Sequence, residues 1–435
     1  MVNSSSHSVL VTDQFHPQTL EQLCCLPNIS VDNKPSISRQ ELLEIIPKYQ
    51  VILTRSGTSV DQQLIDAGSS LQVVARGGVG IANIDLEYAT KKGILVVNAP
   101  GVNTQSAAEI TIALLLSMTR KLPEAQTNLK QGGWDRHRFK GSELNNKTIG
   151  IIGFGHVGRR VAMIASGFGM TVEAYDPYIA PQIFDYAKVT RRNNLNELTS
   201  SCDILSPHVP LNEETRGMIG EKQLMSLKKS SWVLNTARGG VICEESLIKV
   251  LNSGHLSGAA IDTWESEPSP RPELVNHPLV YGTPHIGAAT EEAQLRVGQK
   301  IVAQIHKALS GDVVDHPVNI PGIESTLGQS TSPTRTFMVL AEKLGRLAQQ
   351  ILEFQPSIVE LNLPKNLSDP EKNLLTIAFQ KGYLFQVSHE FISYANATVK
   401  FANTGLSINL ISEVDQPNVF PSSFEDTAIT ITLRH

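Results

Sequence analysis

The chain has 435 residues, of which 41% are hydrophobic, and its formal net charge at pH 7 is -5. This length is enough for two or three domains with sizeable cores. No apolar run approaches the length of a membrane span, no basic block suggests nucleic-acid binding, and residues 1–7 lack the pattern of a signal peptide. The four cysteines have neither a CxxC pair nor metal-ligand spacing, so the composition favours a cytoplasmic protein with reduced thiols and no metal site.

The first hundred residues predict a parallel sheet. Short apolar runs at 9–12, 50–54, 72–75 and 94–97 alternate with polar or helical spacers. Continuous apolar runs are typical of strands that are covered on both faces, as they are in parallel sheets.

A second sheet is predicted further along the chain, after a long apolar helix at 103–121 and a polar, basic connector at 131–141. Strand-like runs recur at 149–153, 172–175, 203–207, 232–236, 258–261 and 280–283. Six such runs with helical spacers are enough for a doubly wound sheet. Another helix is predicted at 290–309.

The last part of the chain has a different pattern. Residues 317–333 are rich in Pro, Gly, Ser and Thr and predict a linker. A helix follows, with one apolar face formed by Phe337, Leu340, Leu344, Leu347 and Ile351. Alternating apolar residues around 406–410 and 429–433 predict strands, so we expect a small, separate α+β domain at the C-terminus.

A glycine motif marks the start of the second sheet. An apolar strand leads directly into GxGxxG, formed by Gly153, Gly155 and Gly158, and a second apolar run ends in Asp176. In a strand-turn-helix context these glycines allow a tight turn, close approach of a pyrophosphate and close packing of helix on strand. A terminal acid can bind ribose hydroxyls and repel a 2′-phosphate. The pattern predicts NAD binding, with a glycine-rich turn in some other α/β sheet as the alternative.

Charged residues follow three later strands of the same sheet. Arg238 comes after one strand, Glu267 after the next, and His285 after the last. Doubly wound sheets hold ligands at the carboxyl ends of their strands. Hydride transfer between a nicotinamide and a hydroxy acid needs a cation for the substrate and an acid/base for its hydroxyl group. Each residue alone also fits an ordinary surface loop, but together, behind a cofactor motif, they favour a dehydrogenase.

Several sequence runs resemble the D-isomer-specific 2-hydroxy acid dehydrogenase family, over residues 9 to about 321. These runs are ARGGVGIANIDL, NAPGVNTQSAAE, GIIGFGHVGRRVA, HVPLNEETRGMI, NTARGGVICEESL, AIDTWESEP and TPHIGAAT. The resemblance implies an α/β fold with two doubly wound parallel-sheet domains, one flavodoxin-like and one of Rossmann type. It also implies a small C-terminal α+β domain.

The resemblance further implies the limits of these domains. Residues 1–99 and 287–320 would bind the substrate, and residues 100–286 would bind NAD. Residues 321–435 resemble the intervening domain of the longer family members, through the run TFMVLAEKLGRLAQQI, without a terminal serine-binding domain. Relatives form dimers around the helix at 103–121, so a homodimer or homotetramer is expected.

The family's catalytic set maps onto Arg238, Glu267 and His285. In these roles His285 exchanges the hydroxyl proton, Glu267 orients the imidazole, and Arg238 holds the substrate carboxylate. The implied cofactor contacts are Gly153, Gly155, His156, Val157, Gly158, Asp176, Val79, Val209, Pro210, Thr215, Thr236, Ala237, Asp262, Gly287 and Ala288. The implied substrate contacts are Arg55, Gly78, Gly80, Asn103 and Arg136.

The substrate class depends mainly on Arg55. It follows a strand in the run LTRSGT, and an arginine there suits a phosphate. The resemblance is greatest to family members that oxidise 3-phospho-D-glycerate, so a small phosphorylated 2-hydroxy acid is expected. Two alternatives stay open, namely a glyoxylate/hydroxypyruvate reductase or another D-2-hydroxy acid dehydrogenase, and an NAD-sensing corepressor that shares the fold.

Overall fold

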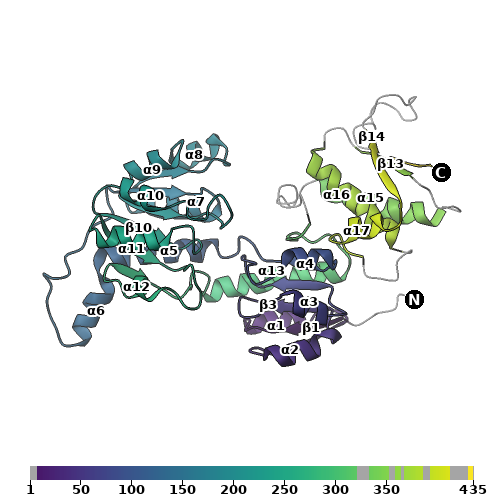
Figure 1. Ribbon diagram of the computed structural model, residues 1–435, viewed down its shortest axis with the longest axis horizontal. Helices are drawn as coiled ribbons and strands as arrows, with labels where there is room; N and C mark the ends of the chain where they lie inside the picture. Colours follow the sequence, from purple (N-terminus) through teal and green to yellow (C-terminus); the bar gives the residue numbers. More distant parts are fainter. Residues whose placement is uncertain are drawn as a thin grey trace. The chain divides into compact units, whose positions relative to one another are not determined.

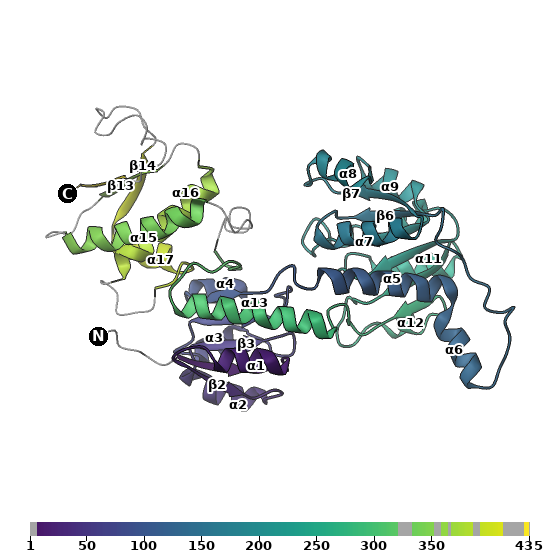
Figure 2. The same cartoon turned by 180° about the vertical axis from the view of Figure 1, so that it is seen from behind.

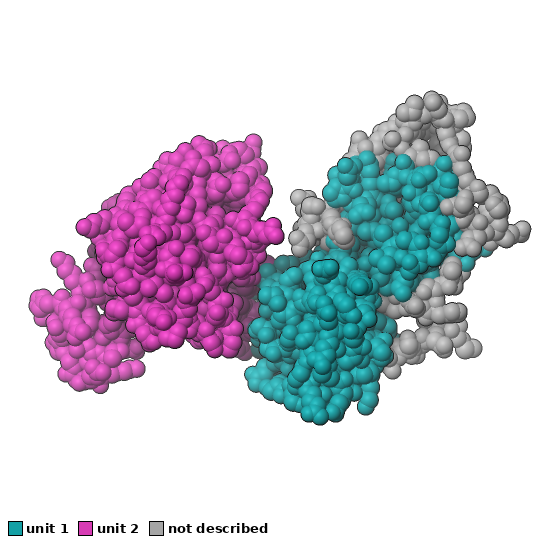
Figure 3. Space-filling model, viewed as in Figure 1, with its two compact units in different colours: residues 1–100, 295–435 teal, residues 101–294 magenta. Residues whose placement is uncertain are grey.

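The computed structural model of the protein describes residues 7–320, 333–351, 358–363, 367–385, 392–411 and 430–434. The chain forms two compact units (Figure 3). The first unit combines residues 1–100 with 295–435, and the second unit is residues 101–294. The domain boundaries that the sequence suggests, after residues 99, 286 and 320, stay a prediction.

The N-terminal part of the first unit is a five-stranded parallel sheet. Its strands are β1 (His7–Val11), β2 (Ile29–Asn33), β3 (Val51–Thr54), β4 (Val73–Arg76) and β5 (Leu95–Val97), in the order β2-β1-β3-β4-β5. This is the flavodoxin-like order, so the predicted fold is confirmed for this part. The intervening helices are α1 (Pro17–Cys24), α2 (Arg39–Ile45), η1 (Ile46–Lys48), α3 (Gln62–Ala67) and α4 (Leu86–Lys91).

Both faces of this sheet are buried. Val9 and Val11 belong to one hydrophobic cluster, which also contains Ile301 and Ile305 of α13 (Glu291–Leu309), whereas Leu10 belongs to a second cluster. Successive side chains of a strand point to opposite faces, so β1, β3, β4 and β5 each contribute to both cores. This explains the continuous apolar runs in the sequence. The edge strand β2 is largely exposed and polar, and the sequence analysis did not detect it.

The C-terminal part of the first unit is a small α+β structure (Figures 1 and 2). It contains α15 (Pro333–Ile351), β13 (Ile358–Asn362), α16 (Asp369–Leu384), α17 (Ala397–Ala402), β14 (Ser407–Ile411) and β15 (Thr430–Arg434). The strand order is β14-β13-β15, with β14 parallel and β15 antiparallel to β13. The predicted linker at 317–333 lies largely outside the described residues. Of the predicted apolar helix face, Leu340, Leu347 and Ile351 are exposed.

Polar contacts join this C-terminal part to the segment after α13. Asp315 accepts hydrogen bonds from Lys307, Gln304 and Arg335, at 2.6, 3.0 and 2.5 Å. The buried Lys381 Nζ donates to Gly311 O and to Glu342 Oε2, both at 2.9 Å. A buried ammonium needs such partners because its desolvation is costly.

The second unit is built on a seven-stranded parallel sheet. Its strands are β6 (Thr148–Ile152), β7 (Thr171–Tyr175), β8 (Thr190–Arg191), β9 (Ile204–Pro207), β10 (Ser231–Asn235), β11 (Leu256–Ile261) and β12 (Val280–Gly282). Their order is β12-β11-β10-β9-β6-β7-β8, the doubly wound Rossmann arrangement with a further strand at one edge. All six predicted strands are present. The seventh, β8, has only two residues, both exposed, and left no apolar signal.

Helices surround this sheet and complete the second unit. They are α5 (Thr104–Arg120), α6 (Leu122–Lys130), α7 (His156–Gly167), α8 (Pro181–Ala187), α9 (Leu195–Ser201), α10 (Glu221–Ser226), α11 (Glu244–Asn252) and α12 (Pro272–Val275). Ile112 and Leu115 of α5 pack in one cluster with Val161 and Ala165 of α7. Within the described residues, no helix is both long enough and apolar enough to span a membrane.

Candidate active site

The glycine motif connects β6 to α7 and brings backbone close to backbone. Gly153 has φ +87°, and a Cβ atom there would lie 2.6 Å from His208 O. A Cβ atom on Gly158 would lie 2.1 Å from Gly153 O, so a larger residue would push the helix off the strand. At Gly155, by contrast, a Cβ atom would meet nothing within 4 Å. The N-terminus of α7 therefore has open space beside it, which suits an approaching pyrophosphate.

Asp176 lies directly after β7 and touches the same turn. Its Oδ2 accepts a hydrogen bond from Phe154 N at 2.8 Å, and its Oδ1 accepts one from Tyr178 N at 2.9 Å. The carboxylate is half-buried, and each oxygen keeps a lone pair for a further donor. The residues present at this turn therefore fit a dinucleotide with free ribose hydroxyls.

The remaining predicted cofactor residues of the second unit lie in loops after the strands. Thr215 Oγ1 donates to Pro210 O at 2.6 Å, which closes the loop after β9. The hydroxyl groups of Thr236 and Thr111 are 2.7 Å apart, and Ala288 O accepts a hydrogen bond from Gln294 Nε2 at 2.6 Å. The other predicted residues in these loops and on α7 are His156, which is exposed, Val157, Val209, Ala237 and Gly287.

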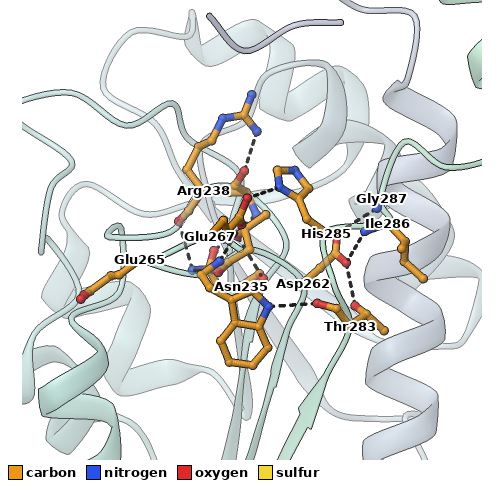
Figure 4. Close-up of polar contacts among 12 residues, drawn as sticks. Asn235, Arg238, Asp262, Glu265, Glu267, Thr283, His285, Ile286 and Gly287 are labelled. Carbon is orange, nitrogen blue, oxygen red and sulfur yellow. Dashed lines mark hydrogen bonds and ion pairs between the residues drawn. The ribbon is translucent and has the colours of Figure 1, made fainter. Parts of the chain in front are cut away.

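Three side chains suited to acid–base and ionic chemistry come together at the carboxyl ends of β10, β11 and β12, those of Arg238, Glu267 and His285 (Figure 4). His285 Nδ1 and Glu267 Oε2 are 2.8 Å apart, and the second carboxylate oxygen of Glu267 accepts a hydrogen bond from Trp264 N at 2.9 Å. Both side chains are partly exposed, at 46% for His285 and 38% for Glu267. A carboxylate on Nδ1–H leaves Nε2 of the neutral imidazole as the proton acceptor, facing away from Glu267.

Arg238 follows β10 and completes this group. Its Nη1 donates to Ala237 O at 2.6 Å, and its own carbonyl accepts a hydrogen bond from Asn235 Nδ2 at 3.1 Å. Burial lowers the pKa of the Arg238 guanidinium, and the negative charge of Glu267 opposes that shift. An arginine remains charged in such surroundings, so the group offers a fixed cation beside an imidazole.

Asp262 fixes the loop that carries His285, which runs from Thr283 to Gly287. This carboxylate is only 1% exposed and accepts three hydrogen bonds, from Thr283 Oγ1 at 2.6 Å, Ile286 N at 2.8 Å and Gly287 N at 2.9 Å. Within the loop, His285 has φ +53°, a left-handed conformation that few non-glycine residues adopt. The backbone from which the imidazole projects is therefore fixed.

Sequence reasoning missed several residues that support this site. Trp264 is buried, and its indole Nε1 donates to Thr283 O at 3.0 Å. Thr283 and Asn235 were not singled out, although both bind the loops that carry the charged residues. The sequence does place both directly beside predicted strand ends, and that position is the one signal that could have identified them.

The predicted substrate residues are spread over both units. In the first unit, Arg55 follows β3, and the turn with Gly78 and Gly80 follows β4. That turn, which also includes the predicted cofactor residue Val79, is closed by Asn98 Nδ2, which donates to Val79 O at 2.8 Å. In the second unit, Asn103 is the N-cap residue of α5, but its side chain makes no capping hydrogen bond. Arg136 is exposed in the connector after α6.

Comparison with curated proteins decides the family. The chain is 39% identical to the D-3-phosphoglycerate dehydrogenase of Methanocaldococcus jannaschii over 401 residues, which cover 92% of this chain and 75% of that relative. The chain belongs to the D-isomer specific 2-hydroxyacid dehydrogenase family. The family model for the NAD-binding domain matches residues 112–287 of this dehydrogenase. It is therefore an NAD-binding D-2-hydroxyacid dehydrogenase, and the predicted family and cofactor are confirmed.

Solved structures agree with this assignment. The dehydrogenase is similar to a glyoxylate reductase from Paecilomyes thermophila, with a TM-score of 0.65 and 28% identity. That match covers 72% of this chain and 98% of the other. It is also similar to an NAD+-bound 3-phosphoglycerate dehydrogenase from Entamoeba histolytica, with a TM-score of 0.61 and 29% identity, covering 72% of this chain and 99% of the other.

Proposed function

We propose that this dehydrogenase oxidises 3-phospho-D-glycerate to 3-phosphohydroxypyruvate. The observation that carries the proposal is the 39% identity to a D-3-phosphoglycerate dehydrogenase over 92% of the chain. Arg55 adds a physical reason, because its guanidinium group offers a fixed charge suited to a phosphate.

The roles of the charged residues follow from their positions. Bound NAD supplies the acceptor for the hydride that leaves the substrate's C2. His285 takes the hydroxyl proton on Nε2 and returns it in the reverse direction. Glu267 fixes the tautomer through Nδ1 and stabilises the imidazolium as it forms. Arg238 holds the substrate carboxylate and polarises the reacting oxygen.

Other predicted contacts complete the proposed site. Asp176 binds the ribose hydroxyls and excludes a 2′-phosphate by charge repulsion. Asp262 keeps one lone pair on Oδ2 for the nicotinamide carboxamide, because that oxygen accepts one hydrogen bond within the described structure. The backbone amides of Gly78 and Gly80, with Asn103 and Arg136, provide further substrate contacts.

We further propose that the protein is a homodimer. No residue of α6 is buried, and Leu122, Leu129 and Trp134 on and after this helix are 51%, 58% and 77% exposed. A nine-residue helix is marginal in water without tertiary contacts, so a second copy is the expected partner for this face. A solution molar mass equal to one chain would contradict this.

The substrate proposal is tested by comparing 3-phosphohydroxypyruvate, hydroxypyruvate and glyoxylate in NADH oxidation. We expect kcat/KM to favour the phosphorylated acid strongly. In Arg55→Ala, KM should rise by about tenfold or more for the phosphorylated acid, the usual effect of losing a charged hydrogen bond, and change little for the others. Equal kcat/KM for all three would instead favour a glyoxylate/hydroxypyruvate reductase, the class suggested by the similarity to a glyoxylate reductase.

A further inference from the structure

The surroundings of Arg55 are more highly organised than those of an ordinary surface arginine. Arg55 is half-buried at the end of β3, beside a pocket of about 430 Å³ whose lining also includes Asp13 and the hydroxyl-bearing residues Thr12, Ser36, Ser56 and Thr58. Burial lowers the pKa of its guanidinium, and the nearby Asp13 carboxylate opposes that shift. The group stays charged, and it faces a polar space large enough for a phosphate.

Asp13 holds the backbone from which Arg55 projects. It comes just after β1, the strand that pairs with β3 (Figure 1). Its Oδ2 accepts hydrogen bonds from Arg55 N and from Thr54 Oγ1, both at 2.7 Å. Its Oδ1 occupies the space beside Gly57, where a Cβ atom would lie 2.3 Å away. Both oxygens of Asp13 are thus directed at the loop of Arg55 to Thr58.

The carbonyl side of the same loop is held separately. Asn83 Nδ2 donates to Arg55 O at 2.7 Å and to Thr58 O at 2.6 Å. Asp13 and Asn83 therefore fix the N–H and C=O groups of Arg55 from two different segments of the first unit. A residue fixed at both backbone groups keeps the direction of its Cα–Cβ bond.

Phe15 limits the side chain itself. The guanidinium carbon of Arg55 is 5.9 Å from the centroid of the Phe15 ring, within the range of a cation–π contact. The ring lies against Gly77, where a Cβ atom would be 2.3 Å from Phe15 Cε1 and 3.5 Å from Arg55 Cγ. Any side chain at position 77 would displace the ring.

We propose that Asp13 is a positioning residue for the phosphate-binding arginine, acting through the backbone of Arg55 and supported by the ring of Phe15. This rests on the proposed function, because it assigns Asp13 a task only if Arg55 binds the substrate. If only charge mattered, removing Asp13 would strengthen phosphate binding, because a carboxylate beside Arg55 weakens the attraction for an anion. In our proposal Asp13 strengthens phosphate binding, because its effect on the position of Arg55 is larger than the repulsion between its own charge and the phosphate.

The test compares Asp13→Ala, Asp13→Asn, Arg55→Ala and the double variant Asp13→Ala/Arg55→Ala, with 3-phosphohydroxypyruvate and hydroxypyruvate as substrates. In Asp13→Ala we expect KM for the phosphorylated acid to rise about tenfold, with kcat within threefold, because hydrogen bonds to a charged acceptor are lost. Asp13→Asn should stay within threefold of the parent enzyme, since its amide oxygen can accept both hydrogen bonds. The double variant should be no worse than Arg55→Ala, because coupled residues are not additive.

Asp66→Ala is the matched control. It removes an exposed carboxylate of the same unit, paired with Lys92 at 2.6 Å, and should leave both substrates unaffected. Additive effects of Asp13→Ala and Arg55→Ala, or a lower KM in Asp13→Ala, would overturn the positioning role. If Arg55→Ala impairs both substrates equally, the phosphate proposal fails, while non-additivity with Asp13→Ala still supports positioning. An unimpaired Arg55→Ala would contradict both.

Discussion

The His285 loop in the second unit and the Arg55 loop in the first unit are each held by an aspartate. The two loops differ in how many contacts hold the backbone and the side chain. Asp262 and Asp13 each follow a parallel strand, and each accepts a hydrogen bond from a threonine hydroxyl; Asp262 also accepts from two backbone N–H groups and Asp13 from one. Asp262 is almost fully buried and accepts three hydrogen bonds, whereas Asp13 is half-buried and holds the Arg55 loop with two.

The difference agrees with the roles that we propose for the two side chains, because proton transfer by His285 requires a more exact position than phosphate binding by Arg55. His285 has a second carboxylate, Glu267, on its ring, while the side chain of Arg55 has a ring contact and one long hydrogen bond, 3.4 Å to Gln14 O. Proton transfer depends on tenths of an ångström, whereas attraction between a guanidinium and a phosphate falls off slowly with distance. The His285 loop is therefore held more tightly than the Arg55 loop, as the two proposed roles require.

The largest effect is expected when the side chain of His285 is removed. His285→Ala removes the proposed proton acceptor and should lower kcat by about 10²–10⁴-fold, the usual contribution of an acid/base. Affinity for NADH, measured by fluorescence titration, should stay unchanged. His306→Ala, at an exposed position on α13, is the control and should be fully active. Turnover of His285→Ala within threefold of the parent enzyme would show that another group exchanges the proton.

The next prediction compares how much Asp262 and Asp13 contribute to the free energy of unfolding. Asp262→Ala leaves the N–H groups of Ile286 and Gly287 without their acceptor and should lower the free energy of unfolding by about 3 kcal/mol or more. Asp13→Ala should lower it by only about 1–2 kcal/mol, because water can reach the half-buried site. Urea denaturation of both variants measures the difference. If the two changes are equal, burial of the anchor does not set its contribution.

The smallest effect concerns a third carboxylate, Asp315, which anchors charged side chains instead of a functional loop. Burial alone would raise its pKa, but hydrogen bonds from Lys307, Arg335 and Gln304 outweigh this and lower the pKa to about 2. Its ionised form therefore stabilises the fold above about pH 4, by at most about 2 kcal/mol, and this contribution is lost as the pH falls toward 2.

Asp315→Asn tests this linkage. The variant should lose stability at pH 6 and show a shallower decrease between pH 6 and pH 3, measured by urea denaturation at each pH. Parallel curves for the variant and the parent protein would mean that Asp315 does not titrate with folding. Asp185→Asn, at an exposed position, is a suitable control for the change of charge.

Most of the fold was predictable because buried parallel strands produce apolar runs. Sequence analysis missed three of the described strands. Two of them, β2 and β8, are edge strands with exposed, polar residues, and the third, β13, is the central strand of the C-terminal sheet. The charged residues Arg238, Glu267 and His285 were predictable from their order behind the glycine motif. The anchors were harder, because what Asp13 and Trp264 do depends on backbone groups brought near by the fold, and no residue type encodes those contacts.

The left-handed backbone at His285 restricts which residue types can occupy this position. Only glycine adopts such a φ freely, and asparagine, aspartate and histidine are the other types that are enriched there. A β-branched side chain would clash sterically with the backbone at this φ, whatever its ability to transfer a proton. The loop therefore limits position 285 to a small set of amino acids, and histidine is the one among them whose side chain titrates near neutral pH.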